Sequence, residues 1–365
     1  IDAANYNTGV GVDVFAALTT GDNNVVIGFG AGDALTSGGQ NVAIGYKALS
    51  TEDAHGSNVA IGRQALENQN AGAEAYNVAI GSLAGNDITT GIKNTFIGGL
   101  TGDANTTGAN NVAIGYQSLS TETTGDRSVA IGFESLKTQN FTGGTTSHNT
   151  AVGNRTGALL TTGLNNTFIG SQSGDANTTA NNNTAVGFDS LGANTTGTEN
   201  VAVGSLALDA NTTSPYNTAV GYLSLSAQTT SAGYNTAIGW KSMTANTTGD
   251  VSVAVGANTL LTNTTGTKNT ALGGNALLSN TEGSNNVAVG YNALDSNTTA
   301  SNNTSVGYAS LAANTTGGNN VAVGIQALDA NTTGDENIGI GSNALGANTT
   351  ADANVGIGGG ALATN

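Results

Sequence analysis

The chain has 365 residues, of which 55 are Gly and only 9% are charged, and its 24 acidic residues against 8 Lys and Arg give a net charge of -16. So few cations cannot neutralise phosphates, which excludes nucleic-acid binding and disfavours contact with anionic membranes. The sequence has no Cys for disulfides or thiolate metal sites, and no apolar run approaches the ~20 residues that span a bilayer. This composition predicts a periodic structure rather than an ordinary enzyme.

A four-residue phrase ending in glycine, such as V-A-I-G at 112–115, recurs 21 times along the chain. The spacing between successive glycines is 17 residues, except for 19 after Gly62, 21 after Gly132 and 18 after Gly221. Repeats this short, rich in Val, Thr, Gly and Asn, predict one β-solenoid turn each. We expect an all-β fold, a parallel β-solenoid or β-roll of about 21 coils, as a single repeat domain over 1–365. The longer spacings predict loop insertions near 63–80 and 133–149.

The first segment of each repeat is expected to be a short strand that ends just before the glycine. The residues three and one before the glycine are almost all Val, Thr or Ile, and we expect them to point into the coil. The glycine predicts a bend or a close approach of backbones. Four before the glycine stands Asn in 19 of 21 repeats, which predicts a structural ladder of hydrogen bonds between layers. Its representatives are Asn24, Asn41, Asn58, Asn111, Asn200, Asn286 and Asn320.

The middle strand position, two before the glycine, is Ala in 14 repeats and never charged or an amide. A solvent-facing column would collect polar residues, so this face is also expected to be buried, and a thin coil has no second interior. The column therefore predicts an interchain face in a homotrimer. The alternative is tight packing of small residues inside one coil. The predicted interchain face comprises Ala43, Ala60, Phe96, Ala113, Phe168, Ala202, Ala254 and Ala288.

The second segment of each repeat carries, four after the glycine, Leu in 14 repeats and Gly in five. Leu there is expected to complete a narrow core. Where the middle column holds a Phe, at Phe96 and Phe168, this position is Gly102 or Gly174. The pairing predicts that the ring fills the space of the missing Leu, so the two columns should meet, within one chain or across chains.

An aromatic stripe is predicted immediately after the glycine, where nine of the 17 aromatic residues of the chain fall. It is a candidate strip for docking a protein or stacking a carbohydrate, or a seam between neighbouring chains, and the seam is the favoured interpretation. The stripe begins at Phe29, and its candidate binding residues are Tyr46, Tyr116, Phe133, Phe188, Tyr222, Trp240, Tyr291 and Tyr308.

The sequence offers no localised cluster for catalysis, so no enzyme activity and no cofactor are expected. The two histidines, His55 and His148, are about five coils apart and are interpreted as surface residues, and acidic pairs such as Glu52 with Asp53 as solvated turns. The recurring N-T-T stretches read as turns rather than glycosylation sites or an ice-binding plane. Aspartates five after the glycine resemble calcium ligands only weakly, because the nonapeptide signature is missing; they are Asp103, Asp175, Asp209, Asp295 and Asp329.

The phrases R-S-V-A-I-G-F-E-S at 127–135 and V-S-V-A-V-G-A-N-T at 251–259 resemble the head repeats of YadA-like trimeric autotransporter adhesins. Arrays of this kind are also similar to those of marine phage tail fibres. The resemblance covers the whole chain and implies a trimeric parallel β-roll at a cell or virion surface, used for attachment to a host protein or glycan. We expect no neck, stalk or membrane anchor of that family within these 365 residues. We expect an extracellular attachment fibre, with a filament of end-to-end stacked solenoids as the alternative.

Overall fold

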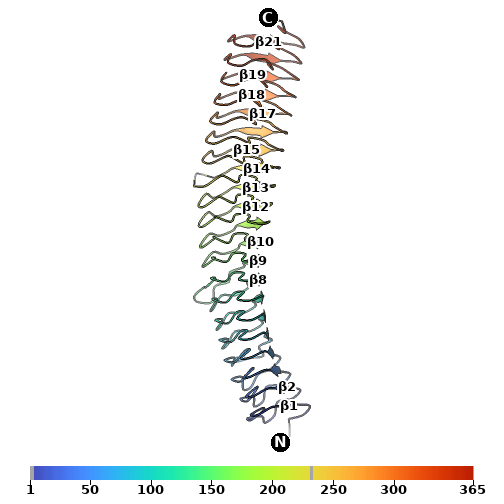
Figure 1. Ribbon diagram of the computed structural model, residues 1–365, viewed down its shortest axis with the longest axis vertical. Helices are drawn as coiled ribbons and strands as arrows, with labels where there is room; N and C mark the ends of the chain where they lie inside the picture. The colour runs from blue at the N-terminus through green and yellow to red at the C-terminus, as the bar shows by residue number, and fades with distance from the viewer. Residues whose placement is uncertain (1–3, 231–232, 365) are drawn as a thin grey trace. The chain divides into compact units, whose positions relative to one another are not determined.

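The computed structural model of the chain describes residues 4–230 and 233–364. The chain divides into two compact units, Ile1–Asn182 and Asn183–Asn365, and each is described by itself. Within each unit, successive coils lie one above another, and each coil contributes one strand of three residues (Figure 1). No helix that could cross a membrane occurs in the described residues. The prediction of an all-β parallel β-solenoid of about 21 turns with a 17-residue repeat is confirmed.

The first unit contains ten strands that pair in parallel from each coil to the next. The two insertions lie in its coils between β4 and β5 and between β8 and β9. The strands are β1 (Thr8–Val10), β2 (Val25–Ile27), β3 (Val42–Ile44), β4 (Val59–Ile61), β5 (Val78–Ile80), β6 (Thr95–Ile97), β7 (Val112–Ile114), β8 (Val129–Ile131), β9 (Thr150–Val152) and β10 (Thr167–Ile169).

The second unit contains eleven strands, also paired in parallel, with each strand position opposite its counterpart in the next coil. They are β11 (Thr184–Val186), β12 (Val201–Val203), β13 (Thr218–Val220), β14 (Thr236–Ile238), β15 (Val253–Val255), β16 (Thr270–Leu272), β17 (Val287–Val289), β18 (Thr304–Val306), β19 (Val321–Val323), β20 (Ile338–Ile340) and β21 (Val355–Ile357).

The glycine after each strand both bends the chain and lets two backbones approach. Gly115, for example, has a φ of 131°, a conformation that residues with a Cβ avoid. A Cβ on Gly115 would also collide with the carbonyl oxygen of Gly132 in the next coil. The repeat therefore requires glycine at this position for two independent reasons.

The core of each coil lies between the middle strand column and the Leu four after the glycine, and outside the first and last coils both positions are buried within one chain. The prediction that the middle column is an interchain face is therefore wrong, and so is the prediction that its two flanking columns point inward. The physical reason is the thinness of the coil, which leaves room for only a small side chain opposite Leu. All eight predicted interchain residues are 0% exposed in the single chain: Ala43, Ala60, Phe96, Ala113, Phe168, Ala202, Ala254 and Ala288.

The predicted exchange between Phe and Gly is confirmed, inside one chain. A Cβ on Gly102 would lie 2.7 Å from the ring of Phe96, and one on Gly174 would lie 2.7 Å from the ring of Phe168. Each ring also covers the equivalent glycine of the preceding coil, Gly85 for Phe96. A large side chain in one inward column is thus paired with a glycine in the other, so the side-chain volume that fills the core is conserved.

The Asn column four before the glycine is buried and connects each layer to the next. The Oδ1 atom of Asn24 accepts the backbone N–H of Asn41 at 2.9 Å, and its Nδ2 donates to the carbonyl of Gly38 across the coil at 3.0 Å. The same link recurs from Asn94 to Asn111 at 2.9 Å. The predicted ladder therefore exists, but its layer-to-layer links run mainly from side chain to backbone. Equivalent links involve Asn41, Asn58, Asn111, Asn200, Asn286 and Asn320.

Candidate binding surfaces

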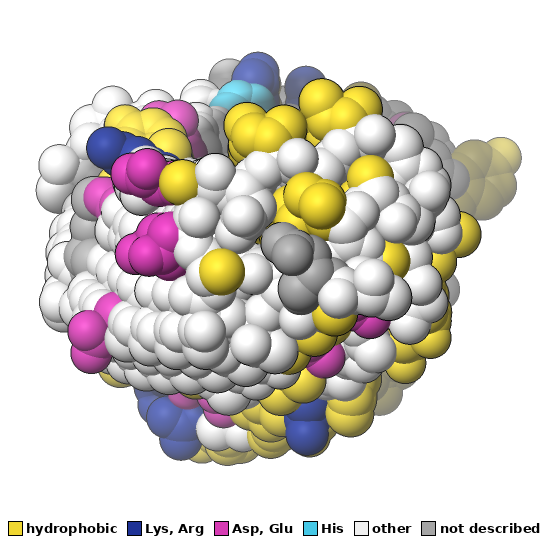
Figure 2. Space-filling model, turned by 90° about the horizontal axis from the view of Figure 1, so that it is seen from above, with side chains coloured by type: hydrophobic (Ala, Val, Ile, Leu, Met, Phe, Trp, Pro, Cys, Tyr) yellow, Lys and Arg dark blue, Asp and Glu magenta, His cyan; other side chains and the backbone are white. Residues whose placement is uncertain are grey.

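Each unit presents an outer sheet face, defined by the residues three and one before each repeat glycine. All 42 of these residues are Val, Thr, Ile or Leu, and none of them is buried. Exposed fractions are 41% for Val253 and 47% for Leu272, and they reach 67% for Ile357 in the last coil. In the end-on view of Figure 2, hydrophobic side chains lie along the upper, right and lower margins of the visible surface. An uncharged, methyl-bearing surface that recurs in every coil is typical of an interaction site.

The aromatic stripe borders the outer sheet face, because residues before and after the glycine share the outward direction. Its members are about half exposed, from 44% for Tyr222 to 54% for Tyr308. Neighbouring rings stack in the first unit, with centroids 5.8 Å apart for Phe29 and Tyr46. The other stacked pairs of the stripe are Tyr116 with Phe133 and Tyr291 with Tyr308. Lys241 lies over the ring of Trp240, 4.6 Å from its centroid, and Phe188 is exposed.

A second internal column, seven after the glycine, holds the Asn of the N-T-T stretches, and the prediction that these stretches form turns is confirmed, as by Asn194 Nδ2 donating to the carbonyl of Gly197 in its own turn at 2.9 Å. In the second unit it is a ladder of buried amides, such as Asn280 Nδ2 donating to Asn263 Oδ1 at 2.7 Å. In each of the three longer coils this position is Gln: Gln69, Gln139 and Gln228. The longer amide spans the enlarged turn, because Gln139 Oε1 accepts from Asn149 Nδ2 at 2.9 Å. Gln in place of Asn at this position was the available sequence signal for an inserted coil.

The coils before the two larger insertions carry a buried carboxylate in the same column, Glu52 and Glu122. Glu52 Oε2 accepts hydrogen bonds from Gln69 Nε2 at 3.1 Å and from the backbone N–H of Ala71 at 3.2 Å. Its Oε1 accepts the backbone N–H of His55 at 3.1 Å. A carboxylate with several N–H donors is a strong anchor. Glu52 therefore holds the base of the loop that follows Gln69.

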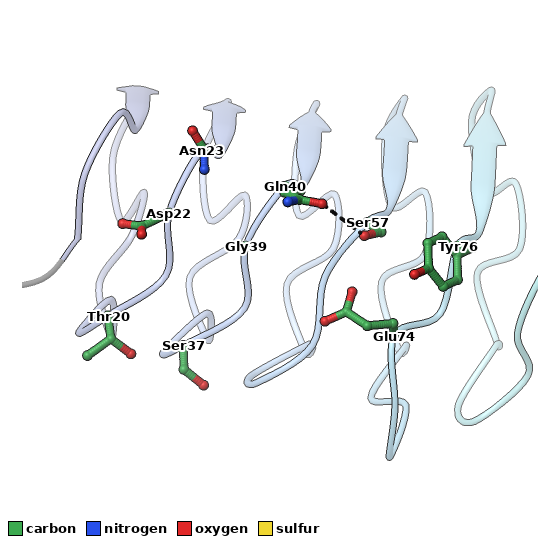
Figure 3. Close-up of a pocket in the computed structure, with 9 residues that line it drawn as sticks. All are labelled: Thr20, Asp22, Asn23, Ser37, Gly39, Gln40, Ser57, Glu74 and Tyr76. Carbon is green, nitrogen blue, oxygen red and sulfur yellow. Dashed lines mark hydrogen bonds between the residues drawn. The ribbon is translucent and has the colours of Figure 1, made fainter.

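That loop overhangs a hollow of about 440 Å³ in the first unit, between the turns of successive coils. Figure 3 shows Asp22 at one end, Gln40 and Ser57 in the middle, and Glu74 with Tyr76 at the other end. Ser57 Oγ donates to Gln40 Oε1 at 3.4 Å. The sequence analysis identified the inserted loop but not this hollow, which requires the coils to be placed side by side.

Among the described residues, the His, Asp and Glu side chains come together as potential metal ligands at one place. One group of three potential metal ligands, Glu52, Asp53 and His55, has ligand atoms within 4.8 Å of one another, but Glu52 already anchors the loop. His148 is exposed, as predicted, whereas His55 is half-buried with Nδ1 3.5 Å from Glu52 Oε1.

The aspartates of the calcium hypothesis form no such group in the part of the chain that the structure describes. Desolvation by burial raises the pKa of Asp209 to about 6, with a smaller contribution from the charge of Asp189. The pKa values of Asp103, Asp295 and Asp329 are raised for the same main reason, while Asp175 is half-buried. These carboxyl groups thus lie partly out of water.

No known protein-family model and no curated protein matches the chain. The resemblance to adhesin and tail-fibre repeats therefore enters only the proposal below.

Proposed function

We propose that the chain is a non-enzymatic, extracellular fibrous protein of the attachment-fibre or adhesin kind, in which several copies associate through the outer sheet face. The observation that carries the proposal is the composition of this face: 42 outward positions without one charged or amide side chain. Outward positions that face only water would tolerate Lys, Glu or Asn. Restriction to methyl-bearing side chains indicates a surface that is covered in the functional state.

A second copy of the chain is the partner that this face fits best. Its rows repeat once per coil, about every 4.8 Å, and only a surface with the same repeat can match it coil after coil. Copies with a net charge of -16 repel one another, so a contact between them has to keep carboxylates apart. The outer sheet face lets two copies approach without bringing carboxylates together.

The resemblance to adhesin head repeats supports a homotrimer, a surface location and attachment to a host protein or glycan. The repetitive chemistry of the chain supports a non-enzymatic role, because catalysis requires unlike groups that converge once. Under this proposal the aromatic stripe lies at the edge of the contact between copies, where aromatic side chains are favoured.

The native mass of the particle tests the proposal. One chain has a mass of 35.7 kDa, so three copies correspond to about 107 kDa (3 × 35.7). We expect a discrete multi-chain particle by analytical ultracentrifugation at micromolar concentration. A monomer at every concentration would contradict the proposal, and open-ended polymers would replace it with the end-to-end filament.

Charge variants locate the contact. Leu272→Glu places a carboxylate on the outer sheet face and should dissociate the particle, because burying an unpaired charge is strongly unfavourable. Thr265→Glu adds the same charge to an exposed turn of the same unit and serves as the matched control. Dissociation by both variants, or by neither, would show that the outer sheet face is not the contact.

A further inference from the structure

The hollow under the first inserted loop combines a backbone floor with two polar walls. Its floor includes Gly39, which stands eleven after its repeat glycine; the next coil has Gly56 at the same position. Most other coils carry a side chain there, such as Ile92 or Asp126. Two consecutive coils beside the hollow thus lack a side chain at this position, and the next coil has a longer loop.

The inserted loop that lines one side of the hollow is anchored to the core by hydrogen bonds. Glu52 accepts the backbone N–H of Ala71 at the start of the loop, and Gln69 Oε1 accepts from Asn77 Nδ2 at 2.8 Å at its end. Both anchoring side chains are fully buried. Glu74 and Tyr76 thus extend from a loop whose two ends are tied to the core, which reduces the ordering entropy that binding must overcome.

The lining chemistry selects the class of ligand. Asp22 and Glu74 supply carboxylate acceptors, Gln40 supplies an amide and Ser57 a hydroxyl, while the ring of Tyr76 is 56% exposed. No Lys or Arg lines the hollow, so phosphate, sulfate and carboxylate groups would meet only like charge. Acceptors beside an aromatic face suit a ligand with many hydroxyl donors and an apolar ring face.

The dimensions of the hollow favour a short chain over a compact molecule. Asn23, Gln40, Ser57 and Tyr76 occupy the same position in four successive coils, so the lining extends about 14 Å along the stack, three layer steps of ~4.8 Å. The volume of about 440 Å³ is in the range of small-molecule sites.

We propose that this hollow binds a short, uncharged oligosaccharide, with Tyr76 stacking on one sugar ring and Asp22, Gln40 and Glu74 accepting hydrogen bonds from its hydroxyls. The inference deepens the proposed attachment function by naming the ligand class and the site. It is independent of the contact between copies, because the hollow lies on the turns and not on the outer sheet face.

A panel of uncharged trisaccharides, maltotriose, cellotriose and triacetylchitotriose, tests the proposal on the full chain by isothermal titration calorimetry. We expect at least one to bind with a dissociation constant of about 1 mM or below. Tyr76→Ala should weaken that binding at least tenfold, and Glu74→Gln should weaken it less, since the amide keeps one acceptor oxygen. Tyr216→Ala is the matched control, because Tyr216 is an exposed tyrosine at the same repeat position in the second unit, and it should leave binding unchanged.

Three results would overturn the proposal. They are no binding by any of the trisaccharides, binding by Tyr76→Ala as tight as that of the wild type, or binding of choline that is tighter than that of the sugars and is lost at high salt. The last would identify the two carboxylates as a cation site, since only charge attraction is screened by salt. Sedimentation of the same samples separates this inference from the proposed function. A multi-chain particle without sugar binding would refute only the site, and a sugar-binding monomer would refute only the assembly.

Discussion

Glu122 is a fully buried carboxylate, and its replacement by Gln tests whether it anchors the larger inserted loop. Its Oε1 accepts the backbone N–H groups of Thr124, Gly125 and Phe141 at 3.2, 2.7 and 3.1 Å. Its Oε2 accepts from Gln139 Nε2 at 3.0 Å. The residues that donate to it come from its own turn and from the loop of the next coil, so one side chain connects both.

The size of the effect follows from these partners. In Glu122→Gln the one remaining oxygen can serve the three backbone amides, but the new NH2 group then faces the NH2 group of Gln139. Gln139 cannot rotate to compensate, because Asn149 Nδ2 donates to its Oε1 at 2.9 Å and its Nε2 also donates to Ser128 Oγ at 2.7 Å. An unpaired buried donor and three weakened charge-assisted bonds together should destabilise the first unit by about 3 kcal/mol.

Urea denaturation measures the loss of stability, and hydrogen exchange at the amides of Thr124, Gly125 and Phe141 shows where it occurs. Glu134→Gln is the control, because Glu134 only pairs with Lys137 near the surface, and it should change stability by less than about 0.5 kcal/mol. The exchanged pair Glu122→Gln with Gln139→Glu should recover part of the loss. If Glu122→Gln matched the wild type in stability and in protection of the three amides, the anchoring role would be wrong.

Three further predictions concern the core and the acidic surface. Asn105 is buried with neither side-chain amide atom hydrogen-bonded, and the same position in the preceding coil is the apolar Ile88. Asn105→Leu should therefore raise the free energy of unfolding by about 1 kcal/mol. A loss of stability in urea denaturation would contradict this prediction. Gly102→Leu and Phe96→Ala should each destabilise the first unit by about 3 kcal/mol. The double variant restores the common pair of Ala and Leu, so it should lose less stability than the sum of the two single variants. Additive losses of stability would refute the packing argument. The pKa of Asp209 is raised to about 6 in the folded chain, so its proton binds more tightly there than in the unfolded chain. The free energy of unfolding should therefore rise as the pH falls from 7 to 4, by about 1 kcal/mol after screening of this half-buried group. Asp209→Asn should remove that rise in thermal melts against pH.

The period and the register of the fold were predictable from the sequence because they depend on local chemistry repeated many times. A glycine that allows a φ near 140°, as at Gly45, and an Asn that bridges two turns, as at Asn41, leave the same signature in every coil. The exchange of bulk between Phe96 and Gly102 was also visible, because volume is conserved between columns that touch. Each of these features can be inferred without knowing which face of the strand points inward.

The direction of the strand faces was not predictable by the usual rule that apolar residues are buried. Val112 and Ile114 are larger and more apolar than Ala113, yet Ala113 is the buried one. Conformational preference was misleading as well, because the inward Leu residues, such as Leu49 with a φ of 51°, adopt a left-handed conformation that costs about 1 kcal/mol. Burial of a Leu side chain contributes about 2 kcal/mol, which outweighs that strain.

The hollow and the anchored loops lay beyond sequence reasoning for a different reason. Gln40, Ser57 and Tyr76 are ordinary turn residues in the sequence, and they become one surface only because successive coils lie in register. Gln69 and Glu52 differ from the consensus Asn by length and charge alone. Their role depends on hydrogen-bond donors from the neighbouring coil. The spacing of 19 residues predicts an inserted loop there but not the positions of those donors.

The thin core also explains why association between copies would follow from the fold. A coil whose interior accepts only Ala opposite Leu cannot bury its β-branched residues, so Val, Thr and Ile must lie outside, where they favour the strand conformation. Thr and Val replace one another freely at the first strand position, as at Thr218 and Val253, because they share a shape although they differ in polarity. Under the proposed function, another copy of the same face covers these positions, because a surface with the same repeat can meet every coil equally.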